Sequence, residues 1–350
     1  MPILGPRCRL PSVGRAPRAP VAAAVRSQAR TIFLALLAAA ASLACDEPQL
    51  PPPAPPASAT VSEHGPILVL GDTQRTFWLE RLIGREQNEA ARRALIARMA
   101  GEEHPSLLVH LGDLVVYGAS DAEWQYFDRL MSPLHERRIP ILPVLGNHDY
   151  WGSDAVALAH ARQRFPALSP HTYYTRQQQG LGLVWLDSNL EGALAEQQAR
   201  WFEASLAEFE RDPATQAVLV FSHHPAYTNG HGREGDRYLR STLLPPFLHV
   251  EKAVAWLSAH VHGYERFSVG GKAFIVSGGG GGPRVAYDPA PDGTPAPVYT
   301  EPSGQPRAFH YLVLAEREGA LQVEVKCLSL GALCPGGLLE TFSLPLPQRH

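Results

Sequence analysis

Side chains that bind metal ions follow five short apolar runs of this chain. In order, the runs end in Asp72, in Asp113, in Asn147 to Asp149, in His223 and His224, and in His260 and His262. Each run is rich in Val, Leu and Ile and is bounded by Gly, Pro or Ser, which is typical of a buried strand rather than of a helix. Because the carboxyl ends of neighbouring strands meet at one edge of a sheet, we expect these side chains to converge on a metal site.

The mixture of donors favours catalysis over a structural role. Asp and Asn oxygens combined with imidazoles suit Mn, Fe or Zn, whereas a lone structural zinc favours Cys. A carboxylate can bridge two cations about 3.5–4 Å apart, and such a pair can bind a phosphoryl oxygen, generate hydroxide and stabilise an in-line displacement. The sequence therefore predicts hydrolysis of phosphate esters at two divalent or trivalent metal ions.

The five motifs resemble the signatures of calcineurin-like metallophosphoesterases, in the same order. The matching segments are GDTQ from Gly71, GD from Gly112, GNHD from Gly146, HHP from His223 and HVHGYER from His260. A single GD or HxH is weak, but all five in order are specific, and the last segment is most similar to the purple acid phosphatase branch. The resemblance implies an α/β fold, a four-layer α/β/β/α sandwich in which helices flank two packed mixed sheets.

The resemblance also implies the ligands of both metals. Those of the first are Asp72, Asp113 and His262, and those of the second are the bridging Asp113, Asn147, His223 and His260. Gln74 stands where many family members have His, and we expect its amide oxygen to be a weaker ligand of the first metal.

His148 stays unligated in this scheme. The resemblance implies that it reaches the phosphate or the leaving oxygen, where it would act as a general acid. We expect Asp149, the next residue, to orient the imidazole and to favour its protonated form.

A tyrosinate ligand is not expected. In purple acid phosphatases a tyrosinate ligand stands three residues after the bridging Asp. This chain has Val116 at that position, and Tyr117 comes one residue later. A shift of one residue in an extended segment turns a side chain to the other face. We therefore expect no Fe(III)–tyrosinate chromophore.

Each motif has a structural interpretation when it stands alone. A GD pair after a strand is often a turn with an Asp cap. Only the presence of the other four motifs favours Asp72 and Asp113 as metal ligands. His110 lies inside the apolar run before Asp113, so we interpret it as a hydrogen-bonded core histidine. For His224, lining of the pocket and simple packing stay open.

Residues that contact the substrate are harder to specify. The segment from Tyr227 to Arg237 is polar and rich in Gly, as in a loop at the rim of a pocket, although a solvated loop has the same composition. The candidates are His224, Tyr227, Asn229 and Arg266, with His231 and Arg233 in the same loop. Arg266 can instead form a structural ion pair. Glycines 278–282 permit close backbone approach.

Length and composition fit one enzyme domain, which we place at residues 61–350. The chain has 350 residues, of which 45% are hydrophobic, and a formal net charge of −3. Such a chain can bury a large core, and it has no basic excess that would indicate a nucleic-acid partner. The expected partner is a phosphorylated small molecule or another phosphoester.

The amino-terminal sequence is typical of an export signal. Six arginines without an acidic residue precede an apolar stretch that ends at Cys45, and this stretch is too short for a membrane span of about 20 residues. The segment SLAC resembles a bacterial lipobox. Residues 1–45 are thus predicted to be a lipoprotein-type signal peptide, and residues 46–60 a Pro-rich linker. The protein is expected to be periplasmic or membrane-anchored through a lipid on Cys45, otherwise secreted.

The remaining pattern alternates strands and helices and ends in strands. We expect helices at 88–100, 122–131 and 195–210, and further strands at 183–187, 274–277, 311–314 and 321–325. In an exported protein Cys327 and Cys334 can close a local disulfide.

These features predict an exported phosphoesterase that needs two metal ions and hydrolyses phosphate monoesters through metal-bound hydroxide. A phosphodiesterase of the same fold is one alternative. A metal-dependent surface binding protein without turnover is the other.

Overall fold

Two mixed β-sheets pack face to face in the computed structural model, which describes residues 65–287, 294–301, 307–328 and 334–347. The predicted signal peptide (1–45), Cys45 and the linker (46–60) lie outside the described residues and stay predictions. Within the described ranges, no helix is long and apolar enough to cross a membrane.

The first sheet has six strands in the part of the chain that is described. In spatial order they are β13 (Leu338–Pro345), β12 (Ala320–Cys327), β11 (His310–Arg317), β1 (Ile67–Leu70), β2 (Leu107–His110) and β3 (Ile141–Pro143). β1, β2 and β3 are parallel to one another. β11, β12 and β13 add an antiparallel half, which joins the sheet where β11 pairs with β1.

The second sheet has seven strands among the described residues. Their order is β10 (Tyr299–Thr300), β8 (Tyr264–Val269), β9 (Lys272–Ser277), β7 (Ala253–Ser258), β6 (Ala217–Phe221), β5 (Leu181–Trp185) and β4 (Tyr174–Gln178). The central strands β5, β6, β7 and β9 are parallel. β4 and β8 run antiparallel to them, and the short edge strand β10 pairs antiparallel with β8.

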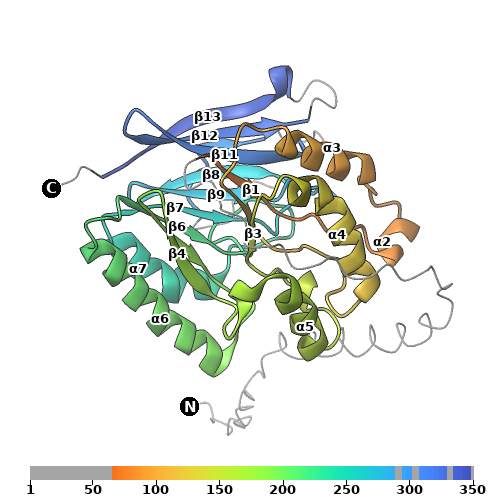
Figure 1. Cartoon of the computed structure of the whole chain (residues 1–350), viewed down its shortest axis with the longest axis horizontal. Helices are drawn as coiled ribbons and strands as arrows, with labels where there is room; N and C mark the ends of the chain where they lie inside the picture. Colours follow the sequence, from red (N-terminus) through yellow and green to blue (C-terminus); the bar gives the residue numbers. More distant parts are fainter. Residues whose placement is uncertain (1–64, 288–293, 302–306, 329–333, 348–350) are drawn as a thin grey trace, which may run out of the picture. The chain divides into compact units, whose positions relative to one another are not determined.

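Helices cover the outer face of each sheet (Figure 1). They are α3 (Glu89–Ala100), α4 (Asp121–Glu136), α5 (Asp154–Arg164), α6 (Gly192–Arg211) and α7 (Leu244–His249). The short helix α2 (Trp78–Leu82) buries none of its residues. Apolar side chains of α3, α4 and α5 pack on the first sheet, and those of α6 and α7 pack on the second. The predicted four-layer α/β/β/α sandwich is confirmed.

The apolar runs of the sequence are strands that are buried on both faces. In β1, Ile67 and Val69 face the core between the two sheets, whereas Leu68 and Leu70 face the core under α3 and α4. A strand with helices on one side and a second sheet on the other has no polar face, so its sequence shows no alternation.

Helix α4 extends past the end that the sequence predicted. The prediction ended at Met131, and beyond it Pro133 lacks the N–H that would bond the carbonyl four residues earlier. In the structure the Ser132 hydroxyl donates to that carbonyl, which belongs to Arg129, at 3.0 Å. A neighbouring side chain thus satisfies the acceptor, and the helix continues to Glu136.

The two cysteines of the predicted pair, Cys327 and Cys334, form a disulfide. Cys327 is the last residue of β12, and Cys334 precedes β13. The bond therefore ties two neighbouring strands of the first sheet at one end.

Replacing Phe202 should test the layer between α6 and the second sheet. Phe202 is fully buried and packs edge-on against Trp256 of β7. Phe202→Ala should lower the free energy of unfolding by about 3–5 kcal/mol, as measured in guanidinium chloride. Leu194→Ala is the control on the same helix, where Leu194 is 57% exposed, and it should change the value by no more than about 0.5 kcal/mol. Equal losses in both variants would contradict this packing.

Candidate metal centre

The five predicted motif segments come together at the carboxyl ends of strands from both sheets. The segments after β1, β2 and β3 belong to the first sheet, and those after β6 and β7 belong to the second. The expectation of one sheet edge is corrected, because two edges meet here. The backbone joins the first two segments: Asp72 N–H donates to Gly112 O, and Gln74 N–H donates to Asp113 O, both at 3.0 Å.

The backbone is left-handed at three of the predicted ligands. The φ angles are 60° at Asp72, 54° at Asp113 and 68° at His260. Non-glycine residues adopt this conformation rarely, and surrounding structure has to hold them in it. Such positions cluster at functional sites, which is where the motifs placed these residues.

One group of side chains, here called the first cluster, consists of Asp72, Gln74, Asp113 and His262. The amide nitrogen of Gln74 lies 3.1 Å from Asp113 Oδ2 and 3.2 Å from His262 Nε2. Asp72 Oδ1 lies 3.5 Å from His262 Nε2. His262 Nδ1–H donates to the carbonyl of Pro283 at 2.6 Å, which fixes the ring and points Nε2 into the cluster.

Two oxygens of the first cluster are buried without a hydrogen-bond partner. They are Asp72 Oδ1 and Gln74 Oε1. A buried acceptor without a partner costs free energy, and a bound cation would satisfy both of these oxygens. Rotating the Gln74 amide by 180° exchanges its two end atoms and would direct Oε1 at Asp113 and His262.

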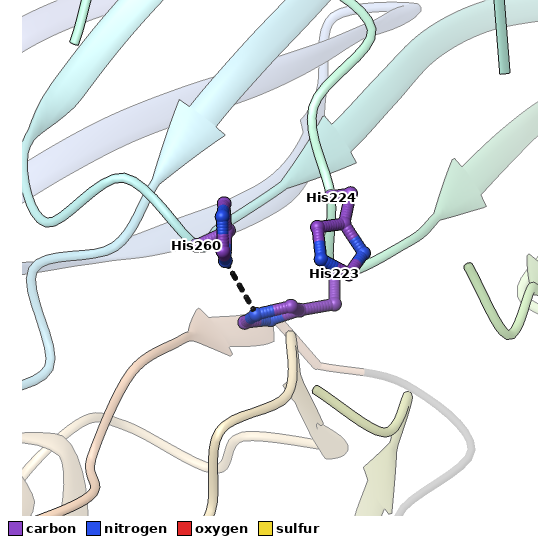
Figure 2. A group of neighbouring side chains, drawn as sticks. All are labelled: His223, His224 and His260. Carbon is purple, nitrogen blue, oxygen red and sulfur yellow. Dashed lines mark hydrogen bonds between the residues drawn. The ribbon is translucent and has the colours of Figure 1, made fainter. Parts of the chain in front are cut away.

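A second group, here called the second cluster, consists of Asn147, His223, His224 and His260. Figure 2 shows the three imidazoles, with the contact between His223 and His260 drawn as a dashed line. His223 Nε2 lies 3.2 Å from both His260 Nδ1 and Asn147 Oδ1. The nitrogen atoms of the three histidines lie within 4.8 Å of one another.

The second cluster brings acceptors together. His223 Nδ1 donates to the carbonyl of Leu111 at 2.9 Å, so Nε2 of the neutral ring is an acceptor. Asn147 Oδ1, also an acceptor, lies 3.2 Å away. Two acceptors that face each other repel unless a cation lies between them, so this donor set fits a metal ion.

The Asp113 carboxylate lies between the two clusters. Its Oδ2 contacts Gln74 at 3.1 Å and His223 Nε2 at 3.5 Å. Its Oδ1 accepts a hydrogen bond from the His148 backbone N–H at 2.9 Å. A Cβ at Gly146 would overlap this carboxylate. A carboxylate in this position could contact ions held by either cluster.

Burial keeps the histidines of the second cluster neutral. It lowers the pKa of His223 and of His224 to about 4, and it lowers the pKa of His260 well below the usual range. Burial also opposes protonation of His262, but the adjacent Asp72 carboxylate raises the pKa of this ring. Metal ligands must be deprotonated, and the second cluster meets this condition.

His148 lies beside the clusters without joining either. Its Nδ1–H donates to the carbonyl of Val116 at 3.1 Å, and its ring packs against Trp151 with the centroids 3.9 Å apart and the planes tilted by 33°. Nε2 lies 4.0 Å from Asp113 Oδ2, and the residue lines the cavity in front of the clusters. This is the position of a group that can reach the substrate.

The role predicted for Asp149 is corrected. Its carboxylate accepts from the backbone N–H groups of Val115 at 3.1 Å and Gly146 at 2.8 Å. It therefore faces the backbone and not the imidazole of His148. Burial raises the pKa of Asp149, and repulsion from Asp113 adds to the rise. The carbonyl of Val116 orients His148 instead.

Three predicted substrate residues lie away from the cavity. Arg266 forms an ion pair with Glu340 and stacks on Phe342. Tyr227 packs against aromatic residues of the second sheet, and the Asn229 backbone N–H donates to the buried Glu265 at 2.9 Å. None of the three is among the residues that line the cavity, and Arg266 forms the structural ion pair that its second interpretation described. Substrate contact by these residues stays a prediction.

His224, His110 and Tyr117 complete the set of residues that the sequence analysis discussed. His224 belongs to the second cluster, and its Nδ1 lies 2.8 Å from the Ser188 hydroxyl. His110 is a buried, hydrogen-bonded histidine, with Nε2 at 3.0 Å from the Thr73 hydroxyl. Tyr117 lies against Gly152, outside the residues that line the cavity.

Three arginines line the cavity that the clusters form. They are Arg75, Arg85 and Arg233. Arg75 could have been inferred, because it directly follows the ligand candidate Gln74. Arg85 and Arg233 carry no motif, and only the folded chain places them here. The glycines at 278–282 show the expected close approach, since a Cβ at Gly278 would overlap Asp72.

Replacing Asp113 should reduce the bound metal more than replacing Gln74. In Asp113→Asn both clusters lose an anionic ligand, so we expect the variant to retain less than about one ion per chain after dialysis, as measured by elemental analysis. Gln74→Ala removes a neutral ligand of one cluster and should retain at least one. Equal metal content in the wild type and the Asp113 variant would contradict the bridging assignment.

Curated relatives of the chain include phosphatases and phosphodiesterases. Purple acid phosphatase 22 of Arabidopsis thaliana is 26% identical over 210 residues, which are 57% of this chain and 44% of the relative. A probable cyclic nucleotide phosphodiesterase of Rhodopseudomonas palustris is 30% identical over 176 residues, 47% of this chain and 58% of the relative. The chain spans about half the length of these curated relatives. The Arabidopsis relative confirms the likeness to purple acid phosphatases that the motifs indicated.

Solved structures show the same fold. A purple acid phosphatase from yellow lupin, Lupinus luteus, has a TM-score of 0.63 at 16% identity and covers 80% of this chain and 53% of its own. A dimetal phosphatase from Danio rerio has a TM-score of 0.55 at 16% identity and covers 81% of this chain and 99% of its own. Residues 65–264 match the sequence profile of the calcineurin-like phosphoesterases. This match spans all five ligand-bearing segments, and the chain belongs to the calcineurin-like phosphoesterase family.

Proposed function

We propose that the protein is a metal-dependent phosphoesterase that holds two metal ions and hydrolyses phosphate monoesters. The observation that carries the proposal is the position of Asp113, whose Oδ2 faces both clusters. The family match and the purple acid phosphatase relatives support it.

Each cluster would bind one of the two metal ions. Asp72, Gln74 and His262 would hold one ion, and Asn147, His223 and His260 would hold the other, with Asp113 between them. A pair of such ions supplies Lewis-acid stabilisation of the phosphoryl oxygens and a nucleophilic water-derived oxygen. The substrate phosphate would lie in the cavity in front of both clusters. Arg233 and His148 line this cavity.

His148 would supply the proton for the leaving oxygen. The Val116 carbonyl holds Nδ1–H and thereby directs Nε2 away from the backbone. Trp151 packs against the ring and restricts its rotation. A proton on Nε2 can then pass to the leaving oxygen of a bound ester.

Hydrolysis of diesters is the second candidate. The relative from Rhodopseudomonas palustris, a probable cyclic nucleotide phosphodiesterase, favours it. The protein reconstituted with Mn, Fe or Zn should be assayed with p-nitrophenyl phosphate and with bis(p-nitrophenyl) phosphate. A higher kcat/KM for the monoester supports the proposal, and a higher value for the diester supports the alternative. No hydrolysis of either ester by protein that retains its metals would overturn both in favour of a binding protein.

Export is part of the proposal. The Arg-rich, apolar amino terminus that ends at Cys45 is its main support. The disulfide between Cys327 and Cys334 adds to it, because disulfides persist in oxidising compartments such as the bacterial periplasm. Radiolabelled palmitate incorporated into the wild type, and not into Cys45→Ala, would support a lipid anchor.

His148→Ala should separate chemistry from metal binding. Both clusters keep their side chains in this variant, so its metal content should equal that of the wild type. Loss of a positioned acid should lower kcat by about 10²–10⁴-fold for alkyl phosphates. The loss should be smaller for p-nitrophenyl phosphate, whose leaving group needs no proton.

Two outcomes would contradict the general-acid role. If metal content fell with activity, His148 would be a ligand. If both leaving groups suffered alike, His148 would act as an electrostatic stabiliser of the phosphate.

A further inference from the structure

We propose that Arg233 makes the site selective for phosphate monoesters by binding the non-ester oxygens of the phosphoryl group. This inference rests on the proposed function and names the group on the chain that would discriminate the substrate class. Arg233 belongs to no motif, and its chemistry comes from its place in the fold.

Arg233 lies at the wall of the cavity, on the side of the second cluster. Its Nη1 is 3.2 Å from His260 Nε2, and it lines the cavity together with His148 and Asn147. A phosphate that contacts the second cluster therefore comes within reach of the guanidinium.

The loop that carries Arg233 is held in place on both sides. Before Arg233, the backbone N–H of His231 donates to the carbonyl of Ala286 at 2.8 Å. After it, the N–H of Asp236 donates to the carbonyl of Pro225 at 2.7 Å. The N–H of Arg233 itself donates to Gly230 O at 2.9 Å. These bonds position the backbone and involve no atom of the Arg233 side chain, whose Nη1 contacts His260 at the cavity.

Arg233 is the arginine of the cavity whose charge is not compensated. Arg75 forms an ion pair with Glu123, and Arg85 lies 3.9 Å from a carboxylate oxygen of Glu80. Arg233 forms no ion pair with a carboxylate of the residues that the structure describes. Its positive charge is therefore available to an anionic ligand.

The nitrogen that Arg233 contacts becomes a donor when His260 acts as a ligand. A neutral imidazole that uses Nδ1 to bind a metal carries its proton on Nε2. Nε2–H and the guanidinium are then two donors directed at the same region. An anionic oxygen placed there can accept from both, so the pair forms a binding point for a phosphoryl oxygen.

Charge and geometry explain why this point would favour monoesters. A monoester carries close to two negative charges at neutral pH and three non-ester oxygens, whereas a diester carries one charge and two such oxygens. The guanidinium fork donates to two oxygens at once and binds more strongly as their charge rises. In a diester the second ester group would occupy one of these oxygen positions.

The test compares Arg233→Gln with Arg237→Gln, both on metal-reconstituted full-length protein. Arg237 is an exposed arginine four residues farther along the chain and is not among the residues that line the cavity. We expect Arg233→Gln to lower kcat/KM for p-nitrophenyl phosphate by about ten- to a hundredfold and that for bis(p-nitrophenyl) phosphate by no more than about threefold. Arg237→Gln should match the wild type on both esters.

A binding measurement separates recognition from turnover. Calorimetric titration with inorganic phosphate should show affinity about tenfold weaker in Arg233→Gln than in Arg237→Gln. Metal content should stay unchanged, and Arg233→Lys should recover part of the phosphate affinity because it restores the charge without the fork.

Several results would overturn the inference. They are an equal loss on both esters, phosphate affinity that does not depend on Arg233, and metal loss in Arg233→Gln, which would mean that Arg233 supports His260 as a ligand. If the wild type hydrolysed neither ester but bound phosphate through Arg233, the proposed function would fail while the phosphate contact stood. If the wild type hydrolysed the monoester and Arg233→Gln matched it, the inference alone would fail.

Discussion

The placement of one carboxylate, that of Asp113, is the constraint on which the rest of the centre depends. Its Oδ2 faces Gln74 on one side and His223 on the other, while the amide of His148 holds Oδ1. Residues of both sheets must therefore approach a single side chain to within contact distance. The packing of the two sheets against each other sets how close the two clusters lie.

Much of this arrangement could be predicted from the sequence, and the reason is the burial of the central strands. Strands such as β1 and β6 are covered on both faces, so they appear as continuous apolar runs. The ligands follow these runs directly. The edge strand β4 (Tyr174–Gln178) was not predicted. Its sequence, YTRQQ, is mostly polar, and only its last side chain is buried.

Contacts between residues distant in sequence decide what the sequence left open or placed wrongly. The structural ion pair of Arg266 was one of two interpretations, and its partner Glu340 lies 74 residues away, so no local pattern identifies it. Asp149 adjoins His148 in sequence, yet its side chain turns to the backbone of Val115 and Gly146. Adjacency along the chain gives a side chain's location but not its direction, and the partners that fix direction come from other segments.

The two-sheet origin of the clusters also bears on how the protein unfolds. His223 and His260 come from the second sheet, whereas Asp113 and Asn147 come from the first. Ions bound between them would be released when either sheet opened, so their binding free energy would oppose partial opening as much as complete unfolding. Metal loading would thus act as a non-covalent cross-link between layers, and it would help the two sheets to melt as one cooperative unit.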